Sequence, residues 1–161
     1  MASIFYIAAS VAVNRSVTRK EICSEIIVNA SAFRVWQVLT DFEAYQQWNP
    51  FIRKVDGVAR HGSRISAQMH LGNHTMTFRP AVLTVKPDRE LRWIGHLFIP
   101  GIFDGEHSFI IEPLNENQVL LVQREGFNGI LVPLFTSVLK DTEKSFNDMN
   151  RALKQRVEQT N

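Results

Sequence analysis

The chain has 161 residues, of which 45% are hydrophobic and 21% charged, and these proportions predict a single globular domain with a hydrophobic core. Its formal net charge of +2 and its scattered lysines and arginines argue against a nucleic-acid-binding protein. The single cysteine, Cys23, excludes an internal disulfide and is compatible with a reducing compartment.

The N-terminal segment, residues 1–20, is predicted to be an extension of a domain that spans residues 21–161. Its run from Ile4 to Val13 is apolar apart from Ser10. This run is shorter than the ~20 apolar residues of a transmembrane helix, and no basic residues precede it as they do in a signal peptide. We therefore expect a cytoplasmic protein without a stable membrane span. The alternative is export or membrane association through this extension.

A strand and two short helices are predicted to open the domain. The β-branched segment Glu21 to Asn29 predicts the strand, in which Cys23 is expected to be a small apolar residue. Ser31 is the expected N-cap of the first helix, and Asp41 that of the second, which Pro50 ends. The apolar stripe of the first helix consists of Phe33, Val35, Trp36 and Leu39.

The first of three predicted β-hairpins has Gly72-Asn73 as a two-residue turn. A turn of this length fixes the pairing, so that Met69 opposes Met76 and Ala67 opposes Phe78. The buried face of this hairpin then carries Ile65, Ala67, Met69, Leu71, Met76 and Phe78.

The second and third hairpins are predicted from turns at residues 87–89 and 114–117. The second pairs Lys86 with Glu90, and connecting it to the first hairpin requires a bulge near Pro80. The best register of the third places His107 near Arg124 on an inward face.

From Ile130 onward the apolar residues recur with the helical period of about 3.6, which predicts one long amphipathic helix. Pro133 lies in its first turn, where the missing N–H costs little. The apolar stripe consists of Leu131, Leu134, Phe135, Val138, Leu139, Thr142, Phe146, Met149, Leu153 and Val157.

This order of elements predicts an α+β fold in which a bent antiparallel sheet wraps one helix. The segments "VWQVLTDFEAYQQWNPFI", "PGIFDGEHSF" and "LVPLFTSVLKDTEKSFNDMNRALKQRVE" resemble the START-like SRPBCC superfamily, specifically its polyketide cyclase/dehydrase and lipid-transport branch. The resemblance spans Glu21 to Glu158. It implies a helix-grip fold, in which about six to seven curved strands and the C-terminal helix enclose a deep cavity closed at one end by the two short helices.

The resemblance also implies binding of a hydrophobic or amphipathic small molecule such as a lipid, polyketide, quinone or sterol-like compound. No cofactor is expected, because the sequence has no dinucleotide fingerprint and no glycine-rich loop that could hold a phosphate. Periodicity alone favours a solid core, and the resemblance is what favours a cavity. The segment Leu97–Gly105 is the expected lid. The expected ligand-binding residues are Trp48, Phe51, Met69, Met76, Phe78, Trp93, Phe103, His107, Phe109, Arg124, Phe135, Leu139 and Phe146.

No catalytic residue is assigned from the sequence, and His107 and Arg124 are the candidates. In an apolar cavity His107 could donate a proton to a bound carbonyl compound and Arg124 could stabilise an enolate, as in a cyclase or dehydratase. The alternative is a polar pair that only orders the sheet. A partner-binding module is a third possibility. His70 and His74 have metal-ligand spacing but point to opposite faces of a hairpin, so no metal site is expected.

Overall fold

The computed structural model describes residues 19–71, 74–97 and 99–159, without the side chains of Leu71 and residues 135–138. The expected extension therefore lies outside the described residues, apart from the start of the first strand. The elements are β1 (Arg19–Val28), α1 (Ala32–Thr40), η1 (Phe42–Ala44), α2 (Tyr45–Trp48), β2 (Ile52–Asp56), β3 (Ser66–Leu71), β4 (His74–Phe78), β5 (Ala81–Lys86), β6 (Glu90–Leu97), β7 (Phe103–Asn115), β8 (Gln118–Asn128), η2 (Val132–Phe135) and α3 (Thr136–Glu158).

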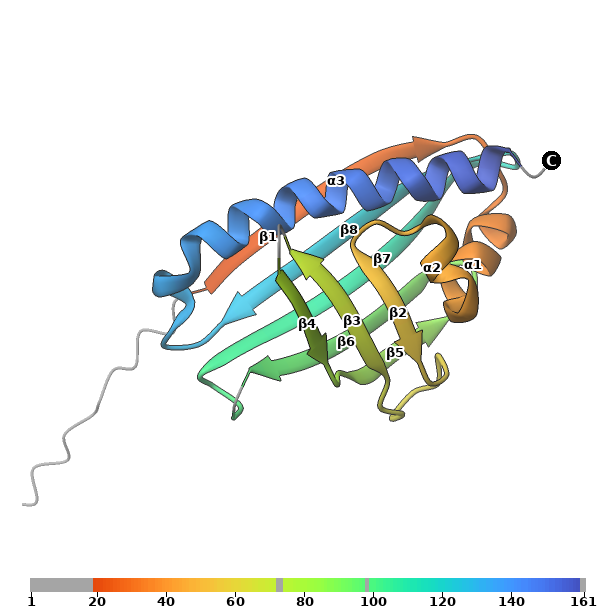
Figure 1. Cartoon of the computed structure of the whole chain (residues 1–161). Helices are drawn as coiled ribbons and strands as arrows, with labels where there is room; N and C mark the ends of the chain where they lie inside the picture. The colour runs from red at the N-terminus through yellow and green to blue at the C-terminus, as the bar shows by residue number, and fades with distance from the viewer. Residues whose placement is uncertain (1–18, 72–73, 98, 160–161) are drawn as a thin grey trace, which may run out of the picture.

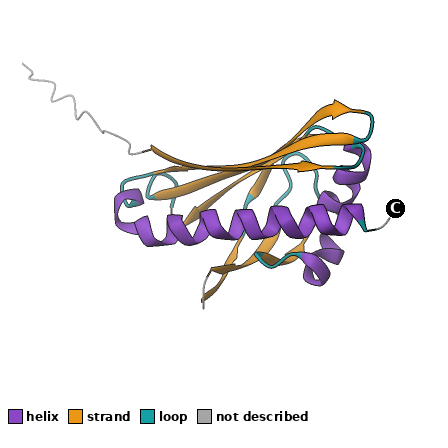
Figure 2. Cartoon of the chain, turned by 90° about the horizontal axis from the view of Figure 1, so that it is seen from above, coloured by secondary structure: helices purple, strands orange, loops and turns teal. Residues whose placement is uncertain are grey.

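The strands form two antiparallel sheets, a large one in the order β1-β8-β7-β6-β5 and a small one in the order β2-β3-β4. The helix α3 runs along the open side of the curved large sheet, and the small sheet lies on the other side of the helix (Figures 1 and 2). The predicted α+β helix-grip fold is confirmed. The prediction of one sheet with six to seven strands is corrected, because the described residues form eight strands in two sheets.

Strand β2 is absent from the sequence prediction because its residues do not alternate between apolar and polar. Arg53 and Lys54 are adjacent and both exposed, and the pairing of β2 with β3 shifts between Ile52 and Lys54. A bulge places two consecutive side chains on nearly the same side and thereby hides the period of two on which strand prediction depends.

The register of the first hairpin is confirmed, including the pairs Met69–Met76 and Ala67–Phe78, while its turn at residues 72–73 lies outside the described residues. The pairing of Lys86 with Glu90 is confirmed as well. The bulge expected near Pro80 is wrong, because the chain there leaves the small sheet and enters the large one. The register shift lies further along, between Val82 and Thr84.

The third hairpin is offset by one residue from the predicted register. Asn115 pairs with Gln118, but the next pair is Pro113 with Val119, so that Leu114 is an extra residue in β7. As a result His107 opposes Glu125 and not Arg124. The predicted proximity of His107 and Arg124 is therefore wrong, and Arg124 is exposed on the outer face of the sheet.

The two short helices are capped as predicted. The Ser31 hydroxyl accepts a hydrogen bond from the Arg34 N–H, and the Asp41 carboxylate accepts one from the Ala44 N–H. The chain is extended at Asn49, before Pro50, where the second short helix ends. Phe33 departs from the predicted stripe, since it is 59% exposed and the buried side chains of α1 are Val35, Val38 and Leu39.

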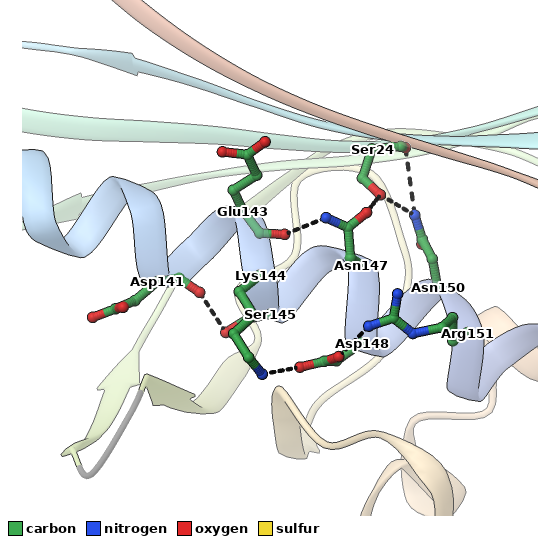
Figure 3. A network of polar contacts seen from close by, with 9 residues as sticks. All are labelled: Ser24, Asp141, Glu143, Lys144, Ser145, Asn147, Asp148, Asn150 and Arg151. Atoms are coloured by element: carbon green, nitrogen blue, oxygen red, sulfur yellow. Dashed lines mark hydrogen bonds and ion pairs between the residues drawn. The ribbon is translucent and has the colours of Figure 1, made fainter.

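The C-terminal half of α3 is attached to β1 by a polar cluster, which Figure 3 shows from close by. The Ser24 hydroxyl donates to the Asn147 Oδ1 at 2.7 Å, and the Asn150 amide donates to the Ser24 hydroxyl at 3.0 Å. The predicted apolar stripe is buried at Phe146, Met149, Leu153 and Val157. It is wrong at Leu134, which lies in η2 and is 75% exposed.

Candidate ligand-binding cavity

A cavity of about 120 Å³ lies between the two sheets and the N-terminal half of α3. Strands β3 and β4 supply one wall, β6, β7 and β8 supply the other, and Thr142 of α3 covers it. The lining residues are Phe51, Met69, Met76, Phe78, Pro80, Trp93, Gly95, Leu97, Phe103, Gly105, Glu125, Phe127 and Thr142.

Strand alternation explains why these residues share the interior. On each of β6, β7 and β8 every second residue faces inward, and the cross-strand pairs align the inward positions of adjacent strands. Gly95 therefore opposes Gly105, and Gly105 opposes Phe127. Two adjacent strands thus carry glycines at inward positions, and the absence of side chains there leaves the space that the cavity occupies.

Six of the expected ligand-binding side chains line this cavity: Phe51, Met69, Met76, Phe78, Trp93 and Phe103. Phe109 and Phe146 are completely buried in the core, while Trp48 and Leu139 are partly buried and pack against it. Arg124 is exposed on the other face of the sheet. The side chain of Phe135 lies outside the described residues.

His107 is buried directly behind the cavity wall, among aromatic rings. Its imidazole stacks on Trp93 with ring centroids 5.1 Å apart and an interplanar angle of 15°. Phe146 meets the imidazole edge-on at 4.9 Å, and Phe109 packs at 4.6 Å. With 1% of its surface exposed, His107 has little freedom to rotate, so its ring nitrogens have fixed directions.

Both ring nitrogens of His107 have polar partners on β8. The Nδ1 atom lies 3.3 Å from the Glu125 Oε2, and the Nε2 atom lies 3.2 Å from the amide nitrogen of Gln123. The Gln123 amide donates to Nε2, which leaves the Nδ1–H to donate to the carboxylate. The row Gln123–His107–Glu125 therefore runs from the core to the cavity surface.

Sequence reasoning missed Glu125 and Gln123, although Gln123 is completely buried and Glu125 lines the cavity. The available signal was the alternation along β8, since residues 123, 125 and 127 share a face with Leu121. The predicted register is in error by one residue, and it therefore places Arg124 on the inward face in place of Glu125. Polar residues in a strand are also normally assigned to the solvent face.

The remaining candidate residues do not form a second site. His96 pairs with Asp104 at 2.7 Å on the outer face, and His61 bonds the Leu83 carbonyl. Cys23 is exposed, and its thiol donates to the Glu25 carboxylate at 3.8 Å. Within the described part of the chain, no cluster of histidine, cysteine or carboxylate side chains could hold a metal ion.

A sheet that grips a long helix around an apolar cavity defines the helix-grip class of small α+β domains. A family model described as "Polyketide cyclase / dehydrase and lipid transport" matches residues 19–158. The chain belongs to this family, within the START-like SRPBCC superfamily. Among curated protein sequences none matches this chain at a significant level.

Solved structures with the same fold include proteins of different activities. A START superfamily protein from Mycobacterium smegmatis has 25% sequence identity and a TM-score of 0.69, covering 88% of this chain and 99% of its own. The Zhui aromatase/cyclase from Streptomyces sp. R1128 has 15% identity and a TM-score of 0.72, covering 88% and 94%. Norcoclaurine synthase from Thalictrum flavum, in complex with dopamine and hydroxybenzaldehyde, has 13% identity and a TM-score of 0.70, covering 100% and 99%.

Among the helices that the structure describes, none combines the length and the apolar character that crossing a membrane requires.

Proposed function

We propose that this protein binds a hydrophobic or amphipathic small molecule in the cavity between the two sheets and α3. The observation that carries the proposal is the composition of the lining. Of its thirteen residues only Glu125 and Thr142 have polar side chains, and the others are aromatic, aliphatic, methionine, proline or glycine. Ligand pockets combine such an apolar wall with a few polar groups that orient the ligand.

The walls supply enough apolar surface for useful affinity. Burying ~200 Å² of apolar ligand surface contributes about 5 kcal/mol at ~25 cal/mol per Å². The volume of about 120 Å³ is smaller than the ~300–1,000 Å³ of common ligand pockets. A ligand of ordinary size therefore requires the wall to open, and the flexible thioethers of Met69 and Met76 are suited to that adjustment.

The part of the loop between β6 and β7 that the structure describes, residues 99–102, is the proposed entrance, a shorter segment than the lid predicted from the sequence. It connects two lining residues, Leu97 and Phe103. The opposite side of the entrance is the turn after β8, where the Leu131 N–H donates to the Ile102 carbonyl. At Gly129, with φ of 136°, an added Cβ would lie 2.3 Å from that carbonyl oxygen, so this contact between the two segments requires glycine.

The test compares two Gly→Val variants. Gly95 lines the cavity, and an added Cβ there meets only the Pro80 Cβ at 3.8 Å, so that Gly95→Val fills the cavity without a backbone clash. Gly126→Val is the matched control on the outer face of β8. Affinity for 4-butylbenzyl alcohol, measured by calorimetry, is expected to fall at least about tenfold in the first variant and less than about twofold in the second. Equal affinities in the two variants would contradict binding in this cavity.

A second candidate function is catalysis on a bound carbonyl compound, as a cyclase or dehydratase. The favouring observation is the contact between the Glu125 carboxylate and His107 at the cavity wall, with Glu125 in the place first expected for Arg124. A carboxylate in an apolar site is suited to accept a proton from the carbon beside a carbonyl, leaving the electron pair in the enolate. If a substrate is identified, Glu125→Gln is expected to lower kcat by at least about 100-fold. Turnover unchanged by that variant would rule out this role.

A further inference from the structure

Glu125 is the one charged residue among the described residues that line the cavity. Its side chain is only 14% exposed. Placing a carboxylate in an apolar wall is costly unless its oxygens accept hydrogen bonds. The arrangement around the two oxygens therefore indicates what the cavity is built to receive.

The two carboxylate oxygens have different surroundings. The Oε2 atom accepts the hydrogen bond from the His107 Nδ1–H at 3.3 Å. The Oε1 atom lies above Gly105, 2.6 Å from the position of an added Cβ, and accepts no hydrogen bond from the described residues. Gly105 therefore leaves room for this oxygen at the cavity surface, where none of the described residues donates a hydrogen bond to it.

Among the described residues, no lysine or arginine pairs with this carboxylate. The imidazole of His107 donates its Nδ1–H to the Oε2 atom and accepts from the Gln123 amide at Nε2. The arginines on the same strands face outward: Arg124 is exposed, and Arg92 pairs with Glu90 and Glu106. A negative potential in a low-dielectric cavity attracts cations and hydrogen-bond donors and repels anions.

We propose that Glu125 is the polar anchor of the cavity and that the ligand presents to its Oε1 a hydrogen-bond donor, either an amine or a hydroxyl, on an otherwise apolar body. His107 and Gln123 are positioning residues that fix the direction of the carboxylate. The site then discriminates against molecules whose polar end is a carboxylate, such as fatty acids. This inference rests on the proposed function, because it requires the cavity to bind a small molecule.

The test uses three probes of nearly the same shape and different charge: 4-butylbenzylamine, 4-butylbenzyl alcohol and 4-butylbenzoate. Calorimetry at neutral pH is expected to give tighter binding of the amine and the alcohol than of the benzoate by at least about tenfold. In Glu125→Gln, the amine is expected to lose at least about tenfold in affinity and the benzoate to gain, since the amide carries no charge. The alcohol is expected to change by less than about threefold.

Two further variants distinguish the effect of the position of the Glu125 carboxylate from the effect of removing any nearby negative charge. Gly105→Ala keeps the charge but displaces Oε1, and since this atom ends a flexible side chain the fold is expected to adjust. It should weaken binding of the amine more than that of the benzoate. Glu106→Gln removes a neighbouring carboxylate that pairs with Arg92 outside the cavity, and it should leave all three affinities unchanged.

The outcomes distinguish the two proposals. Binding of all three probes with the same relative affinities in the wild type and in Glu125→Gln would overturn the anchor role and leave the binding function standing. A preference for the benzoate in the wild type would also overturn the anchor role. No binding of any probe by the folded wild type would count against both proposals.

Discussion

The two halves of α3 have different surroundings although they continue one apolar stripe. In the C-terminal half, Met149, Leu153 and Val157 are completely buried in a solid core. In the N-terminal half, Leu139 is only partly buried and Thr142 lines the cavity. One end of the molecule is therefore packed and the other is hollow.

The cause of this difference lies in what faces the helix. At the packed end, α1, α2 and β1 contact the helix, and Val35, Leu39 and Tyr45 of the two short helices belong to the same buried core. At the hollow end, the large sheet presents Gly95 and Gly105. The amphipathic period of a helix thus predicts which face is turned inward, while the sizes of the side chains opposite decide whether that face meets a core or a cavity.

The two ends are expected to differ most in how much free energy of unfolding is lost when a large side chain is truncated. Leu153 is completely buried at the packed end, and Leu153→Ala is expected to lower the free energy of unfolding by ~2–5 kcal/mol, because it leaves an unfilled void. Met76 is only partly buried at the cavity, and Met76→Ala should cost less than ~1.5 kcal/mol. Urea denaturation of both variants measures the difference. Similar losses would show that the hollow end is packed as tightly as the other.

The next largest loss of stability is expected at Tyr45, whose buried hydroxyl donates to the Leu39 carbonyl at 2.6 Å. Tyr45→Phe is expected to cost about 1 kcal/mol, since that carbonyl is left without its partner. Burial, and to a smaller extent the carboxylate of Asp41, raise the pKa of Tyr45 well above its usual value of 10.0. The phenol must stay protonated in the fold, so its contribution is complete below about pH 10 and is lost as the pH rises further.

Denaturation across the alkaline range checks this expectation. Wild-type stability should decrease above about pH 10 more steeply than that of Tyr45→Phe, which has no phenol to ionise at this position. Parallel pH profiles for the two proteins would mean that water reaches the ring. In that case the end of the molecule around α2 would be open as well, and the comparison of the two ends would fail there.

A smaller effect is expected at the polar cluster that joins α3 to β1. Ser24 and Asn150 are linked by a hydrogen bond of 3.0 Å and both are buried (Figure 3). A double-mutant cycle of Ser24→Ala and Asn150→Ala, followed by chemical denaturation, is expected to give a coupling energy of about 1 kcal/mol. Ser145→Ala is the control, because its exposed hydroxyl bonds only the backbone of its own helix. A coupling near zero would mean that apolar packing alone holds this half of α3.

The regular parts of the fold could be predicted from the sequence, because turn length and period determine them. The predicted two-residue turn at Gly72-Asn73 and the predicted turn at residues 87–89 gave correct registers for their hairpins. The extra residue Leu114 changed the third register by one, and no sequence pattern marks such a bulge. A shift by one residue exchanges the two faces of the partner strand, and this explains why Arg124 was expected inside in place of Glu125.

The apolar walls of the cavity were predictable, but the cavity itself was not. Met69, Met76, Phe78 and Trp93 are large side chains at alternating positions, which mark an inward face of a sheet. The hollow depends on Gly95 opposing Gly105 across two strands, and this requires a register that the sequence leaves open. The row Gln123–His107–Glu125 depends on that same register, since its members come from two strands.

The smallest expected effect is an acid dependence at the packed end. A hydrogen bond from Lys154, and then one from the Asn29 N–H, lower the pKa of Glu158 below its usual value. A carboxyl with a lowered pKa contributes stability above the unfolded pKa of about 4.3, and this contribution is lost as the pH falls through the folded value. Both side chains are partly exposed, so Glu158→Gln should cost only ~0.2–1 kcal/mol at neutral pH and nothing in strong acid. Glu116→Gln, on the exposed turn between β7 and β8, is the control. Urea denaturation at neutral and acidic pH measures both variants, and a loss at Glu158 that persists in strong acid would mean that the side chain acts by packing the helix end and not by its charge.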